Sequence, residues 1–128
     1  MASNQDKLES VIGYQFLDSG LLDRALTHRS FSALNNERLE FLGDSVLGII
    51  VSAVLYRLYT ESEEGELTRM RAQVVKKDTL AQIARRLQLG SYLKLGGSVV
   101  KGGGADIDSI LADALEALIG AVYLDAGL

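Results

Sequence analysis

The chain has no cysteine and no proline, and it has a single histidine, His28. The absence of cysteine excludes disulfides, zinc–thiolate centres and cysteine nucleophiles, and it makes the reducing cytoplasm the expected compartment. The polar N-terminus, Met1–Asp6, lacks the basic-then-apolar order of a signal peptide. The longest apolar run, Val46–Leu55, is interrupted by glycine and serine and is too short to span a bilayer.

Positive charge is also scarce. The formal net charge is −4, which argues mildly against a nucleic-acid partner because phosphate binding depends on Lys and Arg. A metal site built from carboxylates would give the same charge balance even where basic residues line its flanks. At 128 residues the chain is expected to form one domain with its own hydrophobic core.

Apolar residues recur with helical spacing almost throughout, which predicts an all-α helical bundle. Helices are expected over 7–12, 21–26, 66–75, 80–87 and 110–124, and a long one runs from a cap at Asn35 or Asn36 to about Tyr59. The only weak strand candidate, Ser98–Lys101, lies in the glycine-rich segment Gly96–Gly104, where the glycines favour a loop. That loop could bring backbone amides near a phosphate or serve as a mobile connector, and both interpretations stay open.

Two otherwise apolar helices carry carboxylates at helical spacing. Glu37, Glu40 and Asp44 are three and four residues apart, and Asp113 and Glu116 are three apart, so each set lies on one helix face. Buried carboxylates are costly unless they are paired, protonated or bound to a cation, and the second helix has no Lys or Arg. Two such faces meeting in a bundle predict a divalent metal site. Oxygen-only ligands favour Mg²⁺ or Mn²⁺.

The same acids also have ordinary explanations. Glu37 and Glu40 flank Arg38 and could form surface ion pairs with it, and Asp113 could face solvent. A di-iron carboxylate bundle would need Glu-x-x-His pairs, and the single histidine makes that alternative weak. The sequence favours a structural or helix-end role for His28.

Four blocks of the chain occur in the order found in a known family. They are Asn36–Ser45 (Asn-Glu-Arg-Leu-Glu-Phe-Leu-Gly-Asp-Ser), Ala25–Ser30, Glu64–Ala72 and Ser109–Gly120. The first resembles the signature motif of the ribonuclease III family, and the others resemble its upstream, middle and second acidic blocks. The resemblance is to the bacterial type and runs over essentially the whole chain.

The resemblance implies a dimeric, all-helical nuclease domain that cuts double-stranded RNA with Mg²⁺, for which Mn²⁺ could substitute. The expected products carry 5′-phosphate and 3′-hydroxyl ends with short 3′ overhangs, and the expected role is ribosomal and messenger RNA processing. Residues 1–128 would be the nuclease domain, shortened at its C-terminus and without the double-stranded-RNA-binding domain that usually follows.

Site residues are implied in the same way. Glu40, Asp44, Asp113 and Glu116 would hold the metal, with Asp44 and Glu116 acting in catalysis. Glu37 and Glu64 would be accessory acids beside the cleavage valley. Phe41 would insert into the partner subunit of a homodimer, although the residues alone allow it equally to be a core residue.

Candidate RNA-phosphate contacts are basic side chains that could equally be solvated surface charges: Arg29, Arg69, Arg71, Lys76, Lys77, Arg85, Arg86, Lys94 and Lys101. Ala105 and Asp106 stand where relatives often carry basic residues, which should weaken phosphate contacts there. A non-catalytic RNA-binding or dimerisation module is the alternative function, and a helical scaffold without a nucleic-acid partner is a third.

Overall fold

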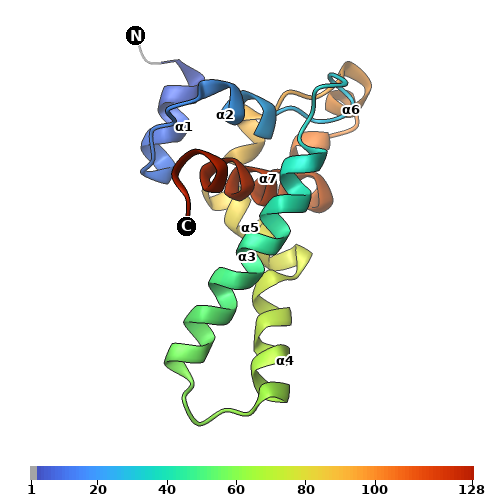
Figure 1. Ribbon diagram of the computed structural model, residues 1–128. Helices are drawn as coiled ribbons and strands as arrows, with labels where there is room; N and C mark the ends of the chain where they lie inside the picture. Colours follow the sequence, from blue (N-terminus) through green and yellow to red (C-terminus); the bar gives the residue numbers. More distant parts are fainter. Residues whose placement is uncertain (1–2) are drawn as a thin grey trace.

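The computed structural model describes residues 3–128, which contain seven α-helices and two short 3-10 helices joined by loops (Figure 1). In chain order they are α1 Asn4–Ile12, α2 Ser19–Ala25, α3 Glu37–Leu58, α4 Glu64–Val75, α5 Lys77–Arg86, η1 Leu89–Tyr92, α6 Gly97–Lys101, η2 Gly104–Asp106 and α7 Asp108–Ala126. Within this range there is no β-strand, only an isolated bridge between Thr27 and Lys94. The predicted all-α class is confirmed.

Two local expectations need correction. The segment Ser98–Lys101 forms neither the loop that its glycines favoured nor the weakly indicated strand, because these residues belong to the short helix α6, where the backbone N–H of Val100 donates to the oxygen of Gly96. The first helix begins before Lys7, because Ser3 and Asp6 form a reciprocal capping box that satisfies free amide groups of the first turn. Polar residues at a helix start carry no apolar periodicity, so the pattern missed them.

The two longest helices, α3 and α7, cross at a pair of glycines. A Cβ atom placed on Gly43 would lie 1.6 Å from the backbone oxygen of Glu116, and one on Gly120 would lie 2.4 Å from that of Leu39. Both distances are far below van der Waals contact, so only glycine allows this approach. The crossing fixes the position of the first half of α3 against α7.

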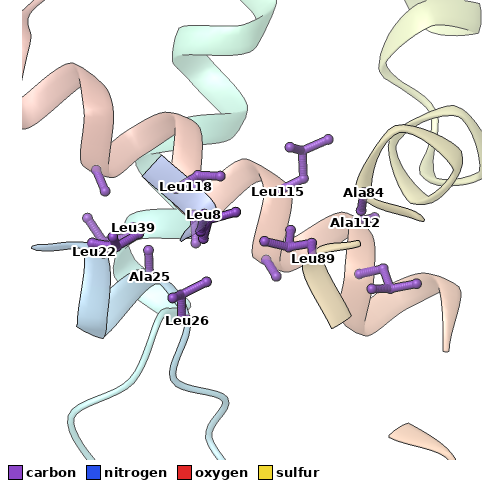
Figure 2. Close-up of a cluster of buried hydrophobic side chains, with 14 of the residues drawn as sticks. Leu8, Leu22, Ala25, Leu26, Leu39, Ala84, Leu89, Ala112, Leu115 and Leu118 are labelled. Atoms are coloured by element: carbon purple, nitrogen blue, oxygen red, sulfur yellow. The ribbon is translucent and has the colours of Figure 1, made fainter. Parts of the chain in front are cut away.

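The hydrophobic core surrounds α7, which is buried on most of its circumference. Leu8, Leu22, Leu89 and Leu111 are the largest fully buried side chains, and Figure 2 shows the cluster in which three of them are labelled. Removing each such leucine from water contributes about 1.5–3 kcal/mol. The core therefore holds α1, α2, η1 and α7 together around the crossing.

The second half of α3 leaves this body and forms a hairpin with α4 (Figure 1). Arg71 of α4 donates a 2.9 Å hydrogen bond to Ser52 of α3, and α4 itself has no buried residue. The whole helix α3, at 22 residues, is longer than the apolar run Val46–Leu55, which by itself is too short to span a bilayer. By length and composition alone α3 could cross a membrane, with a mean hydropathy of 1.7 in a window that is only 22% buried. Several large apolar side chains of this half are exposed: Ile49, Ile50, Val54, Tyr56 and Leu58.

Candidate metal centre

Three carboxylates from two helices converge beside the glycine crossing. Glu40 of α3 and Asp113 and Glu116 of α7 each offer one oxygen, and these atoms all lie within 4.8 Å of one another. All three residues are half-buried. Helical spacing places the acids on their faces, and the contact of Gly43 with the backbone of Glu116 brings the two faces together.

Asp44 extends the cluster on its exposed side. It is not among the three acids whose oxygens converge, but a hydrogen bond joins its carboxylate to the carboxyl group of Glu116. The four predicted metal ligands therefore occupy one continuous site, with Asp44 at the solvent edge.

The proximity of these acids shifts their pKa values upward. Burial raises the pKa of Glu116 to about 8, together with its hydrogen bond to Asp44 and the charges of Asp44, Glu40 and Asp113. Burial raises the pKa of Glu40 to about 7, helped by the charge of Asp113 and a hydrogen bond with it. Both shifts show that negative charge at this point is unfavourable without a cation.

Ion pairing does not offset this charge. Among residues 3–128 the ion pairs are those of Arg85 with Asp106 and Asp108 and that of Lys94 with Asp23. Surface pairing of Glu37 or Glu40 with Arg38 is therefore wrong as an explanation of the acids. The donor set is oxygen-only and strongly negative, which favours a hard divalent cation over zinc or copper.

A small hollow of about 110 Å³ opens beside the cluster. Its lining comes from the loop after α2, the start of α3 and the start of α7: His28, Arg29, Asn36, Glu37, Glu40, Ser109, Ile110 and Asp113. Glu37, the first residue of α3, is exposed here and its charge contributes to the raised pKa of Glu40. The structure thus places this predicted accessory acid next to the predicted metal ligands.

Glu64, the other predicted accessory acid, lies far from the carboxylate cluster in the folded chain. It is the exposed first residue of α4, at the far end of the hairpin (Figure 1). At about 1.5 Å of rise per residue along α3, Glu64 is roughly 25–30 Å from Glu40. One copy of the chain does not bring Glu64 to the cluster.

Phe41 is 78% exposed, so its alternative interpretation as a core residue is wrong. Its side chain borders a hollow of about 600 Å³ between α2, α3 and α7. The hollow is lined by Leu21, Arg24, Glu37, Arg38, Leu39, Phe41, Leu42 and Leu124. An exposed aromatic ring and a largely apolar recess therefore lie side by side on one surface.

The side chain of His28 makes a local contact shortly after the end of α2, in agreement with the structural or helix-end role that the sequence favoured, although the partner residue was not predicted. Its Nδ1 atom accepts the backbone N–H of Ser30 at 3.1 Å and lies 2.7 Å from the Ser30 hydroxyl. Burial and the neighbouring charge of Arg29 lower the pKa of His28. Sequence periodicity cannot predict this contact, because it depends on the conformation of the turn between α2 and α3.

Some basic candidates already have partners within the protein. Arg85 holds Asp106 at 2.9 Å and Asp108 at 2.5 Å, and Lys94 pairs with Asp23. Arg29, Arg69, Lys76, Lys77, Arg86 and Lys101 are exposed. Asp106 therefore adds negative charge to the loop before α7 and pairs with the neighbouring guanidinium of Arg85.

The fold and the site define a class: an all-α domain whose two longest helices carry an oxygen-only carboxylate centre suited to a divalent cation. Comparison with known proteins narrows the class. The family model described as Ribonuclease-III-like matches residues 18–128. The chain belongs to the ribonuclease III family.

Its relatives include Ribonuclease 3 of Marinomonas sp. (strain MWYL1), which is 56% identical over 100% of this chain. Ribonuclease 3 of Pseudomonas aeruginosa (strain LESB58) is 50% identical over the same share. In both cases the match covers 56% of the relative, so the chain spans about half the length of the curated proteins it resembles.

Solved structures agree with this assignment. The nuclease domain of Campylobacter jejuni ribonuclease III, described with structural flexibility in the region involved in dimer formation, superposes with a TM-score of 0.95 at 46% identity, covering 97% of this chain and 87% of that one. Dicer from Pichia stipitis superposes with a TM-score of 0.68 at 35% identity, covering 88% of this chain and 48% of that one.

Proposed function

We propose that this chain is the nuclease part of a Mg²⁺-dependent endoribonuclease that hydrolyses phosphodiesters of double-stranded RNA. Its products would carry 5′-phosphate and 3′-hydroxyl ends with short 3′ overhangs, and its role would lie in ribosomal and messenger RNA processing. The observation that carries the proposal is the convergence of Glu40, Asp113 and Glu116 within 4.8 Å, in a chain 56% identical to a Ribonuclease 3.

In this proposal Glu40, Asp44, Asp113 and Glu116 hold the cation, and Mn²⁺ could replace Mg²⁺. When bound, a divalent cation supplies positive charge that activates water and offsets the charge of the phosphate. Asp44 and Glu116 share a hydrogen bond at the open edge of the site. That position suits them to orient the attacking water and to hold its proton at a carboxylate oxygen.

The working unit in this proposal is a homodimer. A two-fold interface pairs the same patch on both copies, and Phe41 beside its own recess meets that requirement, because each ring can enter the recess of the other copy. The exposed apolar side chains of α3 would add buried area. In such a dimer, Glu64 of the second copy would be the accessory acid that joins Glu37 at the cleavage valley.

Double-stranded RNA would be bound through its shape, phosphates and 2′-hydroxyls rather than its base edges. The exposed candidates that take part in no ion pair within residues 3–128 are Arg29, Arg69, Arg71, Lys76, Lys77, Arg86 and Lys101, although Arg71 also donates a hydrogen bond to Ser52. With a net charge of −4, the domain depends on this limited set of positive charges, so its binding should be weak and sensitive to salt.

The test is cleavage of a generic duplex RNA at low salt, with and without Mg²⁺, by the chain and its variants. Asp44→Asn and Glu116→Gln should lose cleavage while keeping their helical content and size. Asp78→Asn makes the same change in charge at an exposed acid of α5 and should cleave normally. Duplex binding without cleavage by the unaltered chain would refute the enzyme and favour a non-catalytic RNA-binding or dimerisation module.

A further inference from the structure

The ring of His28 is held by the residue two positions along the chain. The backbone N–H of Ser30 donates to Nδ1 at 3.1 Å, and the Ser30 hydroxyl lies 2.7 Å from the same atom. The Ser30 hydroxyl oxygen also accepts the backbone N–H of Gly96 at 2.8 Å. Its own proton is therefore directed to Nδ1.

This arrangement assigns the tautomer of the ring. A backbone N–H can only donate, so Nδ1 must be the acceptor, and in the neutral ring the proton then resides on Nε2. The side-chain hydrogen bonds within residues 3–128 include none from Nε2. A nitrogen that carries a proton offers no lone pair to a cation, so the ring is a donor and not a metal ligand.

The surroundings of the ring supply the context for that donor. His28 lines the small hollow together with Glu37, Glu40 and Asp113, which puts the ring beside the carboxylates that hold the cation in the proposed enzyme. In the proposed enzyme the scissile phosphate would lie at those carboxylates. Backbone oxygens of a neighbouring nucleotide, which are hydrogen-bond acceptors, would then come within reach of residues that line this hollow.

We propose that His28 is a substrate-contacting residue whose Nε2–H donates a hydrogen bond to an RNA backbone oxygen next to the scissile phosphate. Ser30 is the positioning residue that fixes the ring in this tautomer. The acceptor is a 2′-hydroxyl or a non-bridging phosphate oxygen, since both offer the same oxygen lone pair. The inference rests on the proposed function and adds to it a contact on the substrate side of the centre.

The close packing around Ser30 supports a fixed geometry. A Cβ atom on Gly96 would lie 2.4 Å from the backbone oxygen of Ser30, so the start of α6 rests directly on this turn. The backbone N–H of His28 donates to the oxygen of Lys94 at 3.0 Å. These two backbone contacts fix the turn, and the Ser30 hydroxyl and N–H hold the ring where it borders the hollow.

The experiment compares His28→Ala, His28→Asn and His28→Gln with the unaltered chain in Mg²⁺-dependent cleavage of a duplex RNA. The Gln amide places a donor near the position of Nε2, whereas the Asn amide places its donor near that of Nδ1. We expect Ala and Asn to lower kcat/KM by roughly 10- to 100-fold, the effect of losing one hydrogen bond to a charged or strongly polar acceptor. Gln should recover most of the rate, and Ser30→Ala should lower it by a smaller factor.

Modified RNA locates the acceptor. A 2′-deoxy nucleotide or an uncharged methylphosphonate is placed singly on each side of the scissile phosphate. At the contacted oxygen, the modification should slow the unaltered chain and leave His28→Ala unaffected, because that variant has already lost the contact. Sensitivity to the deoxy nucleotide identifies a 2′-hydroxyl, and sensitivity to the methylphosphonate identifies a phosphate.

Several results would overturn the inference. They are cleavage by His28→Ala at the normal rate, equal loss in Gln and Ala variants with a lowered melting temperature, or a rate loss that no backbone modification changes. If the unaltered chain fails to cut duplex RNA with Mg²⁺, the proposed function fails and this inference fails with it. If the chain cuts and only the His28 results disagree, the proposed function stands alone.

Discussion

Gly43 of α3 and Gly120 of α7 lie backbone against backbone. A Cβ atom on Gly120 would be 3.0 Å from the amide nitrogen of Gly43, and one on Gly43 would be 3.1 Å from that of Gly120. Both helices carry acids of the candidate metal centre within about one turn of the crossing, namely Glu40, Asp44 and Glu116. The geometry of the candidate metal centre therefore depends on two residues that have no side chain.

Gly43→Ala should destabilise the domain and weaken cation binding together. Its methyl group would overlap the backbone of α7, and forcing such a group into a packed site costs about 1–3 kcal/mol and occasionally more. Gly48→Ala is the matched control, because a Cβ atom there meets nothing within 4 Å. It should be neutral or stabilising by about 0.5–1 kcal/mol. Denaturant unfolding and Mn²⁺ titration measure both effects, and equal stability of the two variants would contradict the crossing.

In the metal-free protein, stability should fall as pH rises from about 4.5 through about 8. The pKa of Glu40 is raised to about 7 and that of Glu116 to about 8, so the folded state binds more protons than the unfolded state between their ordinary and raised values. Unfolding is then favoured by higher pH. Glu116→Gln should flatten this fall, as measured by urea unfolding at several pH values with chelator present. A slope unchanged by the variant would refute the assignment.

Mg²⁺ should stabilise the folded chain at neutral pH. A ligand that binds only the folded state adds about 2.7 kcal/mol when its concentration is one hundred times its Kd. Glu40→Gln should reduce the rise in melting temperature, and Asp78→Asn, an exposed acid of α5, should not. Calorimetry across a Mg²⁺ series measures the effect, and an equal rise in both variants would place the cation elsewhere.

Phe41→Ala should shift the chain toward monomer in solution. Truncating a central aromatic residue of an interface costs about 2 kcal/mol or more, equivalent to roughly 30-fold in the dimer dissociation constant. Phe31→Ala removes another exposed ring, 56% accessible, and should leave association unchanged. Analytical ultracentrifugation over a concentration series distinguishes them. A dimer constant unaffected by Phe41→Ala would remove this ring from the interface.

The end of α7 is tied to the turn between α1 and α2 through Asp125. This carboxylate accepts the Tyr14 hydroxyl at 2.5 Å and the backbone N–H groups of Leu17 and Asp18 at 2.8 and 3.0 Å. The hydrogen bonds from Tyr14 and the backbone lower the pKa of Asp125, and the bond to Asp125 raises the pKa of Tyr14 to about 12.

Two pH limits follow from this pair. The contribution of Asp125 is present above its ordinary pKa and is lost as pH falls through its lowered value. That of Tyr14 is present below about pH 10 and is lost as pH rises toward 12. Asp125→Asn should therefore reduce the loss of stability that occurs as pH falls into the acid range. Tyr14→Phe should reduce the loss of stability that occurs as pH rises toward 12. Thermal unfolding from acid to alkaline pH tests both.

Sequence alone was enough for the longer helices and for the faces that carry the acids, because helical periodicity is local. It placed Glu40 with Asp44 and Asp113 with Glu116, but their approach depends on the crossing at Gly43, whose partner residue no local pattern identifies. The loop favoured for the glycine-rich segment, with its weak strand candidate Ser98–Lys101, was wrong where the short helix α6 forms, because the glycines at its start give no helical periodicity. The tautomer of His28 depends on one turn and on the hydroxyl of Ser30, and neither can be recognised from a periodic pattern in the sequence.

The long helix α3 carries Glu40 and Phe41 as neighbours, one in the metal centre and the other on the surface proposed to meet a second copy. The same helix therefore connects cation binding with the association of two copies. Any tilt of α3 that improves the fit of one also changes the free energy of the other, and thermodynamic linkage makes this effect reciprocal. The factor by which cation raises the affinity between copies must equal the factor by which pairing raises the affinity for cation.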